Sequence, residues 1–579
     1  MQVAGLVVFE RQEREFISDF ARRLAAYVAD RYGATIACQI AGKSLLFSTD
    51  NCVTGETARG RFALSGYNTA PDRSELCGFV ERAQSCTEPS FEVTNSIGGL
   101  FSIFALTAEG GVALRSKPAC SGVYYGQTPG MLVACNRPGL AAAILESEID
   151  PSYLDWLIAT GFPLDDTTPF CGVRAVLGHQ ALRVRHDRLE LIGYTLTGQG
   201  ARCQGESETQ SRHEDFEQEM LRACGAVSQF NEVELRLSGG KDSRLIAAAI
   251  AHQGLSVPCR TRGQSEDADL AEQVAQIAGF PIQREVVQHR ATNPEDFQQQ
   301  SLDALGWSDG LIEFETHVAY EKPIGHSPST DGILFGHSHL QKGAFAKNMQ
   351  GTSPDRAQEI LRDSYIPKDI RTEHRARFLA PIAHHFDPKL YEAPIDMLFE
   401  PYAIYRIGRY IEPLYLKLSR FMVPLFPLDD ERFFLACSRM NRHHRTREIA
   451  CHAALQSFAP EMLAIPFFQD KWRFEPLSAM PKPLPPSGGK PNFRQIPVEF
   501  IQFARAALRG TNILERSIDL LEDNFLATCG LHPKMSSNER PTHARLARKT
   551  VLRLYLLHLL ETEFDVGRLP ASAPAQSAA

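Results

Sequence analysis

The chain has 579 residues and a formal net charge of −8, from 61 lysines and arginines against 69 aspartates and glutamates. At roughly 150 residues per domain, this length predicts about two to four domains. Its 22% charged and 43% hydrophobic residues exclude a disordered chain, and the mild acidity argues against a dedicated nucleic-acid binder.

Cysteine use and the first residues indicate where the protein resides. The 13 cysteines are scattered and form no CxxC pair, so we expect reduced, buried thiols and neither a zinc ribbon nor a thioredoxin-like motif. The first apolar run lacks a basic region and soon meets Glu10, Arg11 and Glu13, which is not the pattern of a signal peptide. No run approaches the ~18 apolar residues of a membrane span. We therefore expect a cytoplasmic protein that does not interact with membranes.

Residues 1 to about 200 are predicted to be rich in β-strands. Short apolar segments, such as Gly99–Leu106 and Met131–Cys135, are separated by clusters of Gly, Ser, Asn and Pro. The stretch Gly200–Arg212 is rich in Gly, Ser, Gln and Glu and has no apolar periodicity. We interpret it as a linker.

From Val227 onward, strands and helices are predicted to alternate. Apolar residues at every second position predict a strand over Val233–Leu237, and an Ala- and Ile-rich run predicts a helix over Ser243–Gln253 that ends at Gly254. The further predicted elements are a helix with one face formed by Leu270, Val274 and Ile277, and strands over Ile282–Val287 and Gly332–Phe335. This alternation favours a doubly wound parallel sheet.

Downstream of Asp387 the chain is predicted to be mainly helical. Pro476–Pro491 is expected to be a surface loop, Pro497–Glu563 to be helical, and Pro570–Ala579 to be disordered because it is rich in Ala, Ser and Pro. The predicted organisation is an N-terminal domain over 1–205, an α/β domain with its helices over 206–565, and a disordered tail over 566–579.

The segment Leu237-Ser-Gly-Gly-Lys-Asp-Ser-Arg244 lies between the predicted strand and helix and has the strongest chemical signal. Its glycines permit positive φ and let backbone N–H groups approach an anion, while its two serines add hydroxyl donors. The helix that starts near Asp242 adds the positive end of its dipole. The Asp242 carboxylate disfavours a bare phosphate, so we expect it to bind an Mg²⁺ ion that bridges the phosphates. The segment therefore predicts a phosphate-binding loop, and it is not a Walker A loop because GxxxxGK[ST] is absent.

This segment resembles the pyrophosphate loop of the ATP pyrophosphatase (PP-loop) superfamily, and specifically that of the asparagine synthetase family. Three further segments resemble that family in order and spacing: Thr168–Gly178, Pro427–Arg432 and Ile465–Pro476. The resemblance covers residues from about 130 to 480. It implies an N-terminal αββα domain like that of N-terminal nucleophile hydrolases, followed by an α/β adenylating domain with a helical C-terminal part.

The resemblance also implies a set of site residues, with ATP and Mg²⁺ as cofactors. Lys471 corresponds to the family's active-site lysine, and the apolar Phe467, Phe468, Trp472 and Phe474 around it are expected to bury its stem. Such a lysine would offset charge that develops during adenylation. The implied roles are catalysis by Asp242 and Lys471, metal binding by Asp242, and nucleotide binding by Leu237, Ser238, Gly239, Gly240, Asp242, Ser243 and Gly336.

Two departures from the family change the expected chemistry. The glutaminase nucleophile of the family is a cysteine after the initiator methionine, and here that position is Gln2. Without a thiol beside a free amine the glutaminase mechanism fails, as in β-lactam synthetases and lasso-peptide cyclases. The family's acidic loop corresponds best to Leu334–Gly343, which retains Gly336 but has no carboxylate after it. Asp309 or Asp331 is a candidate substitute, and Lys342 is a candidate to place positive charge where a metal would otherwise act.

Several other polar residues have both a structural and a functional interpretation. Asp267 is either the family's acid after the second strand or an ordinary acid at a helix start, and Asp429 and Asp430 are expected to cap a helix. The basic Arg442–Arg447 segment is expected to be a solvated helix face. His337 and His339 are expected to be plain loop residues, with catalytic polar contacts as the alternative, and the sequence offers no partner for the pair His384 and His385.

The leading hypothesis is an AMP-forming carbon–nitrogen ligase that adenylates a substrate carboxylate, releases pyrophosphate and couples the acyl group to an amine without hydrolysing glutamine. The expected partners are a small-molecule or peptide substrate with both groups, as in lasso-peptide or β-lactam biosynthesis, and other biosynthetic proteins, but no nucleic acid. Alternatives are amidation with ammonia as in asparagine synthetases, an RNA-modifying adenylase, or a degenerate nucleotide-binding scaffold.

Overall fold

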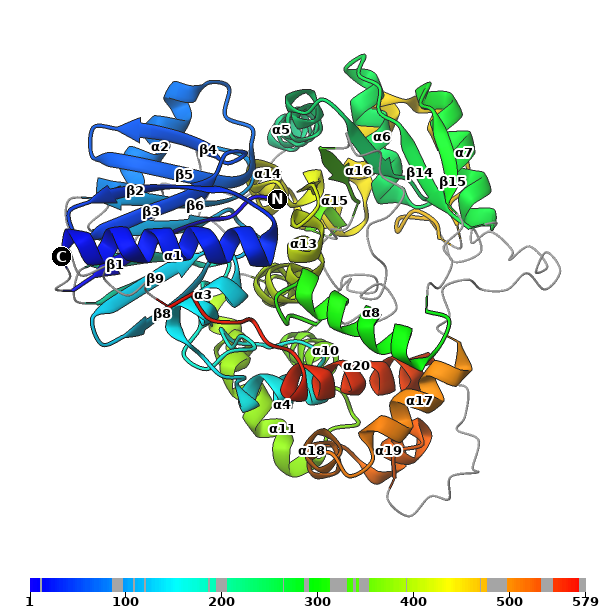
Figure 1. Ribbon diagram of the computed structural model, residues 1–579. Helices are drawn as coiled ribbons and strands as arrows, with labels where there is room; N and C mark the ends of the chain where they lie inside the picture. Colours follow the sequence, from blue (N-terminus) through cyan, green and yellow to red (C-terminus); the bar gives the residue numbers. More distant parts are fainter. Residues whose placement is uncertain are drawn as a thin grey trace, which may run out of the picture.

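The computed structural model describes residues 1–10, 13–85, 97–107, 110–118, 121–185, 188–193, 206–263, 265–285, 291–312, 331–336, 340–342, 353–391, 393–468, 470–475, 497–532 and 545–571. Figure 1 shows three parts: a β-rich part, a smaller part with a parallel sheet, and a group of helices that adjoins both.

The strands of the β-rich part are β1 (Ala4–Phe9), β2 (Ile36–Ala41), β3 (Ser44–Thr49), β4 (Val53–Thr57), β5 (Gly60–Asn68), β6 (Gly99–Thr107), β7 (Gly110–Arg115), β8 (Tyr124–Thr128), β9 (Met131–Cys135), β10 (Arg174–Ala175), β11 (Gln180–Arg185) and β12 (Leu189–Gly193). They form two antiparallel sheets, with the orders β10-β8-β9-β1-β3-β2 and β12-β11-β7-β6-β5-β4.

The helices are α1 (Arg14–Tyr32), α2 (Arg73–Ser85), α3 (Pro138–Leu145), α4 (Pro151–Ala159), α5 (Glu206–Gly225), α6 (Lys241–His252), α7 (Glu266–Ala278), α8 (Pro294–Trp307), α10 (Pro354–Tyr365), α11 (Thr372–Leu379), α12 (Asp396–Pro401), the π-helix η7 (Tyr402–Tyr410), α13 (Glu412–Ser419), α14 (Glu431–Arg439), α15 (Arg442–Thr446), α16 (Ile449–Phe458), α17 (Val498–Leu508), α18 (Asn512–Leu520), α19 (Asp523–Cys529) and α20 (Arg545–Thr562). Short 3₁₀ turns include η3 (Leu340–Lys342), η8 (Pro427–Asp429) and η9 (Pro460–Ala464).

The β-rich part has four layers: helix α1, the sheet that contains β1, the second sheet, and helix α2. As a result, β1 is buried on both faces. Val7 and Phe9 belong to the apolar cluster that also contains Phe20 of α1, whereas Leu6 and Val8 belong to the cluster between the two sheets. A third cluster packs α2 against the outer face of the second sheet. Alternation along a strand thus gives each face its own core, and the expected αββα arrangement is present.

The second part contains a five-stranded sheet whose strands are β13 (Val233–Arg236), β14 (Cys259–Arg262), β15 (Ile282–Glu285), β16 (Gly332–Leu334) and β17 (Val423–Leu425). Their order is β15-β14-β13-β16-β17, and all neighbours pair in parallel. The predicted parallel sheet is therefore confirmed. The predicted strands and helices of this region match the observed ones to within about two residues, which is the usual uncertainty of element ends.

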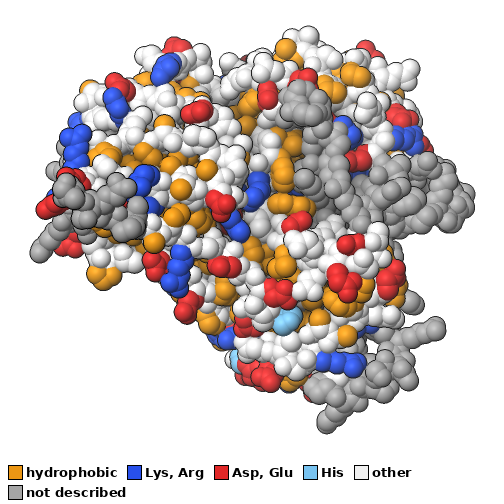
Figure 2. Space-filling model, in the orientation of Figure 1, with side chains coloured by type: hydrophobic (Ala, Val, Ile, Leu, Met, Phe, Trp, Pro, Cys, Tyr) orange, Lys and Arg blue, Asp and Glu red, His pale blue; other side chains and the backbone are white. Residues whose placement is uncertain are grey.

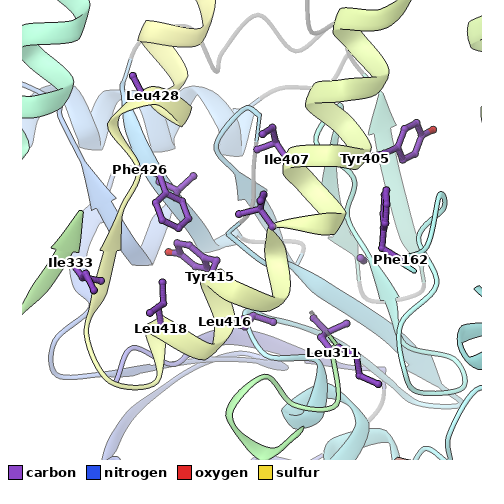
Figure 3. Close-up of a cluster of buried hydrophobic side chains, with 14 of the residues drawn as sticks. Phe162, Leu311, Ile333, Tyr405, Ile407, Tyr415, Leu416, Leu418, Phe426 and Leu428 are labelled. Atoms are coloured by element: carbon purple, nitrogen blue, oxygen red, sulfur yellow. The ribbon is translucent and has the colours of Figure 1, made fainter. Parts of the chain in front are cut away.

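Helices far apart in the sequence pack below the sheet. Phe297 of α8 stacks on Phe500 of α17, with ring centroids 4.9 Å apart, and on Tyr555 of α20 at 5.7 Å. Figure 3 shows another part of the same buried core. There the rings of Tyr415 of α13 and Phe426 after β17 have centroids 6.2 Å apart and join the helices to the sheet. The C-terminal region is mainly helical, as expected.

A buried ion pair connects the β-rich part to the helices. Arg137, which follows β9, donates from Nε to Asp309 at 2.8 Å, and the hydroxyl of Tyr32 donates to the same carboxylate oxygen at 3.1 Å. Arg137 and Asp309 are both fully buried. Asp309 has φ +52°, a left-handed conformation that aspartate tolerates better than most residues.

Two sequence-based interpretations need correction. The proposed linker Gly200–Arg212 overlaps helix α5, which begins at Glu206. The proposed disordered tail from residue 566 begins with placed residues, since Val566 is buried and its carbonyl accepts a hydrogen bond of 2.5 Å from Tyr27 of α1. Residues 572–579 lie outside the described part of the chain.

Among the residues that the structure describes, the visible face (Figure 2) shows no extended region of one charge. Figure 2 shows acidic and basic side chains interspersed, with hydrophobic side chains gathered over the β-rich part. Among the described residues, no helix is both long and apolar enough to cross a bilayer.

Candidate functional site

The predicted phosphate loop lies where the strand order of the parallel sheet reverses. From β13 the chain proceeds to β14 and β15 on one side, and later to β16 and β17 on the other. The carboxyl ends of β13 and β16 are adjacent because the two strands pair in parallel. Open α/β sheets bind ligands at such a switch point, and both Leu237–Gly240 and Gly336 follow these strand ends.

Serine hydroxyls hold the loop around the start of α6. Ser238 donates its backbone N–H to Oγ of Ser243 at 3.1 Å, the two hydroxyls lie 3.0 Å apart, and Gly240 N–H donates to Oγ of Ser238 at 3.2 Å. Gly240 is the N-cap of α6 and makes no side-chain capping bond. The first-turn N–H groups of α6 thus lack the usual cap, which is the arrangement that binds anions at helix N-termini.

The loop glycines are required for space and not for positive φ. Gly239 and Gly240 are absent from the positions with positive φ, and Gly240 has φ −79°, so the expectation of left-handed backbone here is wrong. A Cβ on Gly239 would lie 2.9 Å from Cβ of Leu270, and one on Gly336 would lie 2.8 Å from the backbone N of Ser243. Gly336 therefore packs directly against the start of α6.

Asp242 forms an ion pair instead of facing an open metal site. Its Oδ1 lies 2.6 Å from Nζ of Lys342 and accepts a 2.8 Å hydrogen bond from Nε2 of Gln341. Burial alone would lower the pKa of Lys342, but the carboxylates of Asp242 and Glu448 outweigh it and raise that pKa above its ordinary value. The lysine is therefore charged at neutral pH.

The expected Mg²⁺ does not fit this donor set. Magnesium needs several oxygen ligands in an octahedral arrangement, and the oxygen of Asp242 that faces the loop is bound by an ammonium group. Among the described residues, no group of three or more His, Cys, Asp or Glu side chains is arranged to hold a metal ion. His337 and His339 lie outside the described residues.

A second lysine, Lys241, forms a buried network that the sequence did not reveal. Its Nζ lies 2.7 Å from Oε2 of Glu448 and 3.0 Å from Oδ2 of Asp470. Glu448 also accepts the backbone N–H of Arg473 at 3.0 Å. Glu448 is 1% exposed and has φ +64°, a conformation that is costly for glutamate and is often found at functional sites.

The predicted segment around Lys471 does lie beside the loop. Arg244 of α6 is fully buried, donates to the carbonyls of Ile465 at 2.5 Å and Pro466 at 2.8 Å, and lies 4.2 Å from the ring centroid of Phe467. The backbone N–H of Phe468 donates to the carbonyl of Gly239 at 3.3 Å. Arg244 and the loop backbone therefore hold the Ile465–Phe468 segment against the start of α6.

The amine of Lys471 is directed into its own turn. It donates to the carbonyl of Glu475, while the carbonyl of Lys471 accepts from Lys241. Trp472 is buried and stacks on Phe474 at 6.0 Å, so both aromatic residues pack as expected. The lysines that form ion pairs at the loop are Lys241, with Glu448, and Lys342, with Asp242.

The candidate acids fall into two groups. Asp267 is brought to the loop, where its Oδ1 accepts the backbone N–H of Gly239 at 2.9 Å. Asp309 is held by Arg137, and Asp331 accepts from Asn231 before β16, at the opposite edge of the sheet. Neither of these two is placed to replace the missing carboxylate.

The remaining predictions near the helices have mixed outcomes. Asp430 caps α14 by accepting from the backbone of Arg432 at 2.9 Å, as expected, and Asp429 beside it is fully buried. The interpretation of Arg442–Arg447 as a solvated face is wrong, since Arg442 pairs with Asp396 at 2.6 Å and Arg445 is buried.

The pair His384 and His385 has partners both nearby in the sequence, Tyr391, and distant from it, His179. His385 is buried, and its Nδ1 lies 2.7 Å from the hydroxyl of Tyr391. His384 and His179 lie close enough to lower its pKa further, after burial, to about 3.

Comparisons with known proteins add little to this geometry. No protein-family model matches the chain, and no curated protein matches it. Among solved structures, glutamine phosphoribosylpyrophosphate amidotransferase from B. subtilis complexed with ADP and GMP is 9% identical over 51% of this chain and 67% of that one, with a TM-score of 0.22. A structure described as the allosteric regulatory enzyme of purine biosynthesis has the same identity and coverage and a TM-score of 0.21. At these TM-scores neither similarity carries an argument about fold or activity.

Proposed function

We propose that this protein is an ATP-dependent ligase of the asparagine synthetase type, in which the Leu237–Arg244 loop binds the phosphates of ATP. The observation that supports this most strongly is the uncapped start of α6 at the switch point of a parallel sheet, lined by two serine hydroxyls. A helix N-terminus with convergent backbone donors stabilises phosphate charge.

The proposed reaction has two steps. A substrate carboxylate oxygen attacks the α-phosphorus of ATP, and the bond to the β-phosphate breaks as pyrophosphate leaves. An amine then attacks the acyl carbon, loses a proton and displaces AMP. The ammonium groups of Lys241 and Lys342, fixed by Glu448 and Asp242 at 2.7 Å and 2.6 Å, would stabilise the negative charge that moves to the leaving pyrophosphate.

The amine is proposed to come from the substrate and not from glutamine. Gln2 occupies the position of the family's nucleophile, and its side chain is held by a 2.8 Å bond to the carbonyl of Asn51 and a 2.5 Å bond from the N–H of Gly66. A carboxamide at this place offers no thiolate for amide hydrolysis. We therefore favour a specialised substrate, of the kind closed to a lasso peptide or a β-lactam, over amidation with ammonia.

Equilibrium binding of ATP and of inorganic pyrophosphate tests the proposal directly. Ser243→Ala removes the hydroxyl that holds the loop, so we expect the dissociation constant for both anions to rise about tenfold. Ser228→Ala is the matched control, because Ser228 is exposed and its hydroxyl donates to the carbonyl of Gly225 in its own turn. If neither ATP nor pyrophosphate binds to the wild-type protein, the proposal is contradicted.

Pyrophosphate release tests the ligase chemistry. A panel of amino acids, β-amino acids and peptides should contain carboxylates that trigger release with the wild type, and Asp242→Ala should abolish it. Glutamine should not serve as nitrogen donor. Release that is unaffected by Asp242→Ala would exclude a role of this loop in the reaction.

A degenerate nucleotide-binding scaffold is the second candidate. It is favoured by the ion pair between Asp242 and Lys342, which occupies the carboxylate that the family's chemistry assigns to a metal. Tight ATP binding without pyrophosphate release across the whole carboxylate panel would support it.

A further inference from the structure

The ammonium of Lys342 is fixed beside the loop by contacts on both its side chain and its backbone. Nζ lies 2.6 Å from Oδ1 of Asp242, and Gln341 donates to the same oxygen at 2.8 Å. The carbonyl of Lys342 accepts a hydrogen bond from the guanidinium of Arg473, which also lies 3.5 Å from Glu448. The side chains of Lys342 and Asp242 are 8% and 16% exposed. The positive charge is thus preorganised and largely shielded from water.

The ammonium of Lys342 lies on the carboxylate to which the family resemblance assigns a divalent cation, that of Asp242. Asp242 is in the first turn of α6, directly after Lys241, and Gly336 packs against the backbone of Asp242 and Ser243. Lysine is an effective phosphate binder when its ammonium is held as a point charge. Lys241 supplies a second fixed ammonium from the same helical turn, held by Glu448 at 2.7 Å.

A metal ion at Asp242 would meet two physical obstacles. It would have to displace the ammonium from Oδ1, and it would then place two positive charges near a buried cation, where Coulomb repulsion is only weakly screened. In the part of the chain that the structure describes, Asp242 belongs to no group of three or more His, Cys, Asp or Glu side chains that could hold a metal ion. The local chemistry therefore favours a lysine over a metal.

We propose that Lys342, held by Asp242, is a built-in substitute for a divalent cation, so that the loop binds pyrophosphate and nucleotide phosphates without a metal ion. This inference rests on the proposed function, because it concerns the same loop. Asp242 then acts as a positioning residue that orients the lysine, and the first turn of α6 with Lys241 and Lys342 forms a phosphate cradle made of protein alone.

Isothermal titration of inorganic pyrophosphate in EDTA and in excess Mg²⁺ tests the inference with the wild-type protein. We expect dissociation constants that differ by less than about threefold between the two buffers. Lys342→Met should weaken binding about tenfold or more in EDTA, because it removes the positive charge while keeping a long apolar stem. Lys342→Arg, which retains the charge, should bind more tightly in EDTA than Lys342→Met. Lys368→Met is the control, because Lys368 has a side chain that is 80% exposed and should bind as the wild type does.

Electron paramagnetic resonance of Mn²⁺ gives a readout that needs no turnover. We expect no Mn²⁺ bound at the loop of the wild-type protein without nucleotide. Binding of Mn²⁺ that Asp242→Asn abolishes would overturn the inference, as would pyrophosphate binding by the wild type in Mg²⁺ but not in EDTA. Either result leaves the proposed function intact. Failure of pyrophosphate and ATP to bind in both buffers would instead overturn the proposed function and, with it, this inference.

Discussion

Lys241 and Glu448 form a buried ion pair of 2.7 Å although they lie 207 residues apart in the sequence. Lys241 belongs to the first turn of α6 and Glu448 is the N-cap residue of α16. Because Lys241 also donates to the carbonyl of Lys471, the pair fixes the Leu237–Arg244 loop against the segment that contains Lys471. The same carboxylate accepts the backbone N–H of Arg473. The geometry of the candidate site therefore depends on Glu448 as much as on the loop itself.

We predict that Glu448→Ala destabilises the protein by about 3–5 kcal/mol, because it leaves the buried ammonium of Lys241 with only part of its counter-charge. Urea unfolding at neutral pH measures this change. Glu461→Ala is the control, since Glu461 is exposed and its replacement should change the free energy of unfolding by less than about 0.5 kcal/mol. Equal effects of the two substitutions would show that the ion pair contributes nothing.

Gly336→Ala should weaken ATP binding and lower stability by about 1–3 kcal/mol, as overpacking does. The added Cβ would lie 2.8 Å from the backbone N of Ser243 and 3.0 Å from the backbone C of Asp242, so the start of α6 must move. Gly306→Ala in α8 is the matched control, because nothing lies within 4 Å of its added Cβ. We expect it to be neutral or to stabilise by up to about 1 kcal/mol, with ATP binding unchanged. Titration calorimetry and thermal unfolding measure both effects.

The free energy of unfolding should fall as the pH is lowered below about 6.5. Burial and nearby imidazoles lower the pKa of His385 to about 3 and that of His179 to about 4. The unfolded chain binds protons at these sites from about pH 6.5 downward and the folded chain does not. Below that pH, each histidine therefore lowers the free energy of unfolding by about 1.4 kcal/mol per pH unit until its folded-state pKa is reached. The titratable side chains near His385 are those of Tyr391 at 2.7 Å, Glu400 at 4.0 Å, Tyr405 with ring centroids 5.9 Å apart, His384 and His179.

The variant with both His179→Gln and His385→Gln separates this effect from general acid denaturation. We expect it to lose less stability than the wild type between pH 7 and pH 5, by about 2 kcal/mol or more on the same scale. Urea unfolding at the two pH values gives the comparison. An identical loss in both proteins would exclude the buried imidazoles as its source.

Asp309→Ala should destabilise by about 3–5 kcal/mol, since the fully buried guanidinium of Arg137 would lose its counter-charge. Asp309→Asn should cost less, because asparagine tolerates the left-handed backbone at this position and still accepts a hydrogen bond from Tyr32. The exposed Asp303→Ala is the control, with an expected change below about 0.5 kcal/mol. Thermal and urea unfolding measure all three, and a ranking with Asp309→Asn as the most harmful would contradict the assignment of the ion pair.

The elements around the loop were predictable because their signals are local. The alternation at Val233–Leu237, the helix that ends before Gly254 and the cap at Gly279 are each encoded within a few residues. Strands separated by helices then restrict the topology to a parallel sheet. The location of the loop at the end of β13 follows from these elements alone.

The charges of the site were not predictable in the same way. Lys241 occupied the variable position of the motif, and nothing near Glu448 in the sequence indicates that the two would meet. The family resemblance and the aromatic neighbours of Lys471 predict that its amine faces the loop, yet this amine donates to the carbonyl of Glu475. Pairing of side chains that are far apart in the sequence depends on tertiary packing, and no local pattern in the sequence indicates it.

The long separation between α6 and its partners has a consequence for the order of synthesis. When the ribosome has completed residues 1–440, the strand, loop and first turn of α6 are all available, but Glu448 and the carbonyls of Ile465 and Pro466 that accept from Arg244 are not yet made. Until they emerge, Lys241 and Arg244 retain hydrated charges that oppose their burial. Lys241 is therefore translated 207 residues before Glu448, and the Leu237–Arg244 loop acquires its final geometry only when the C-terminal third of the chain has been made.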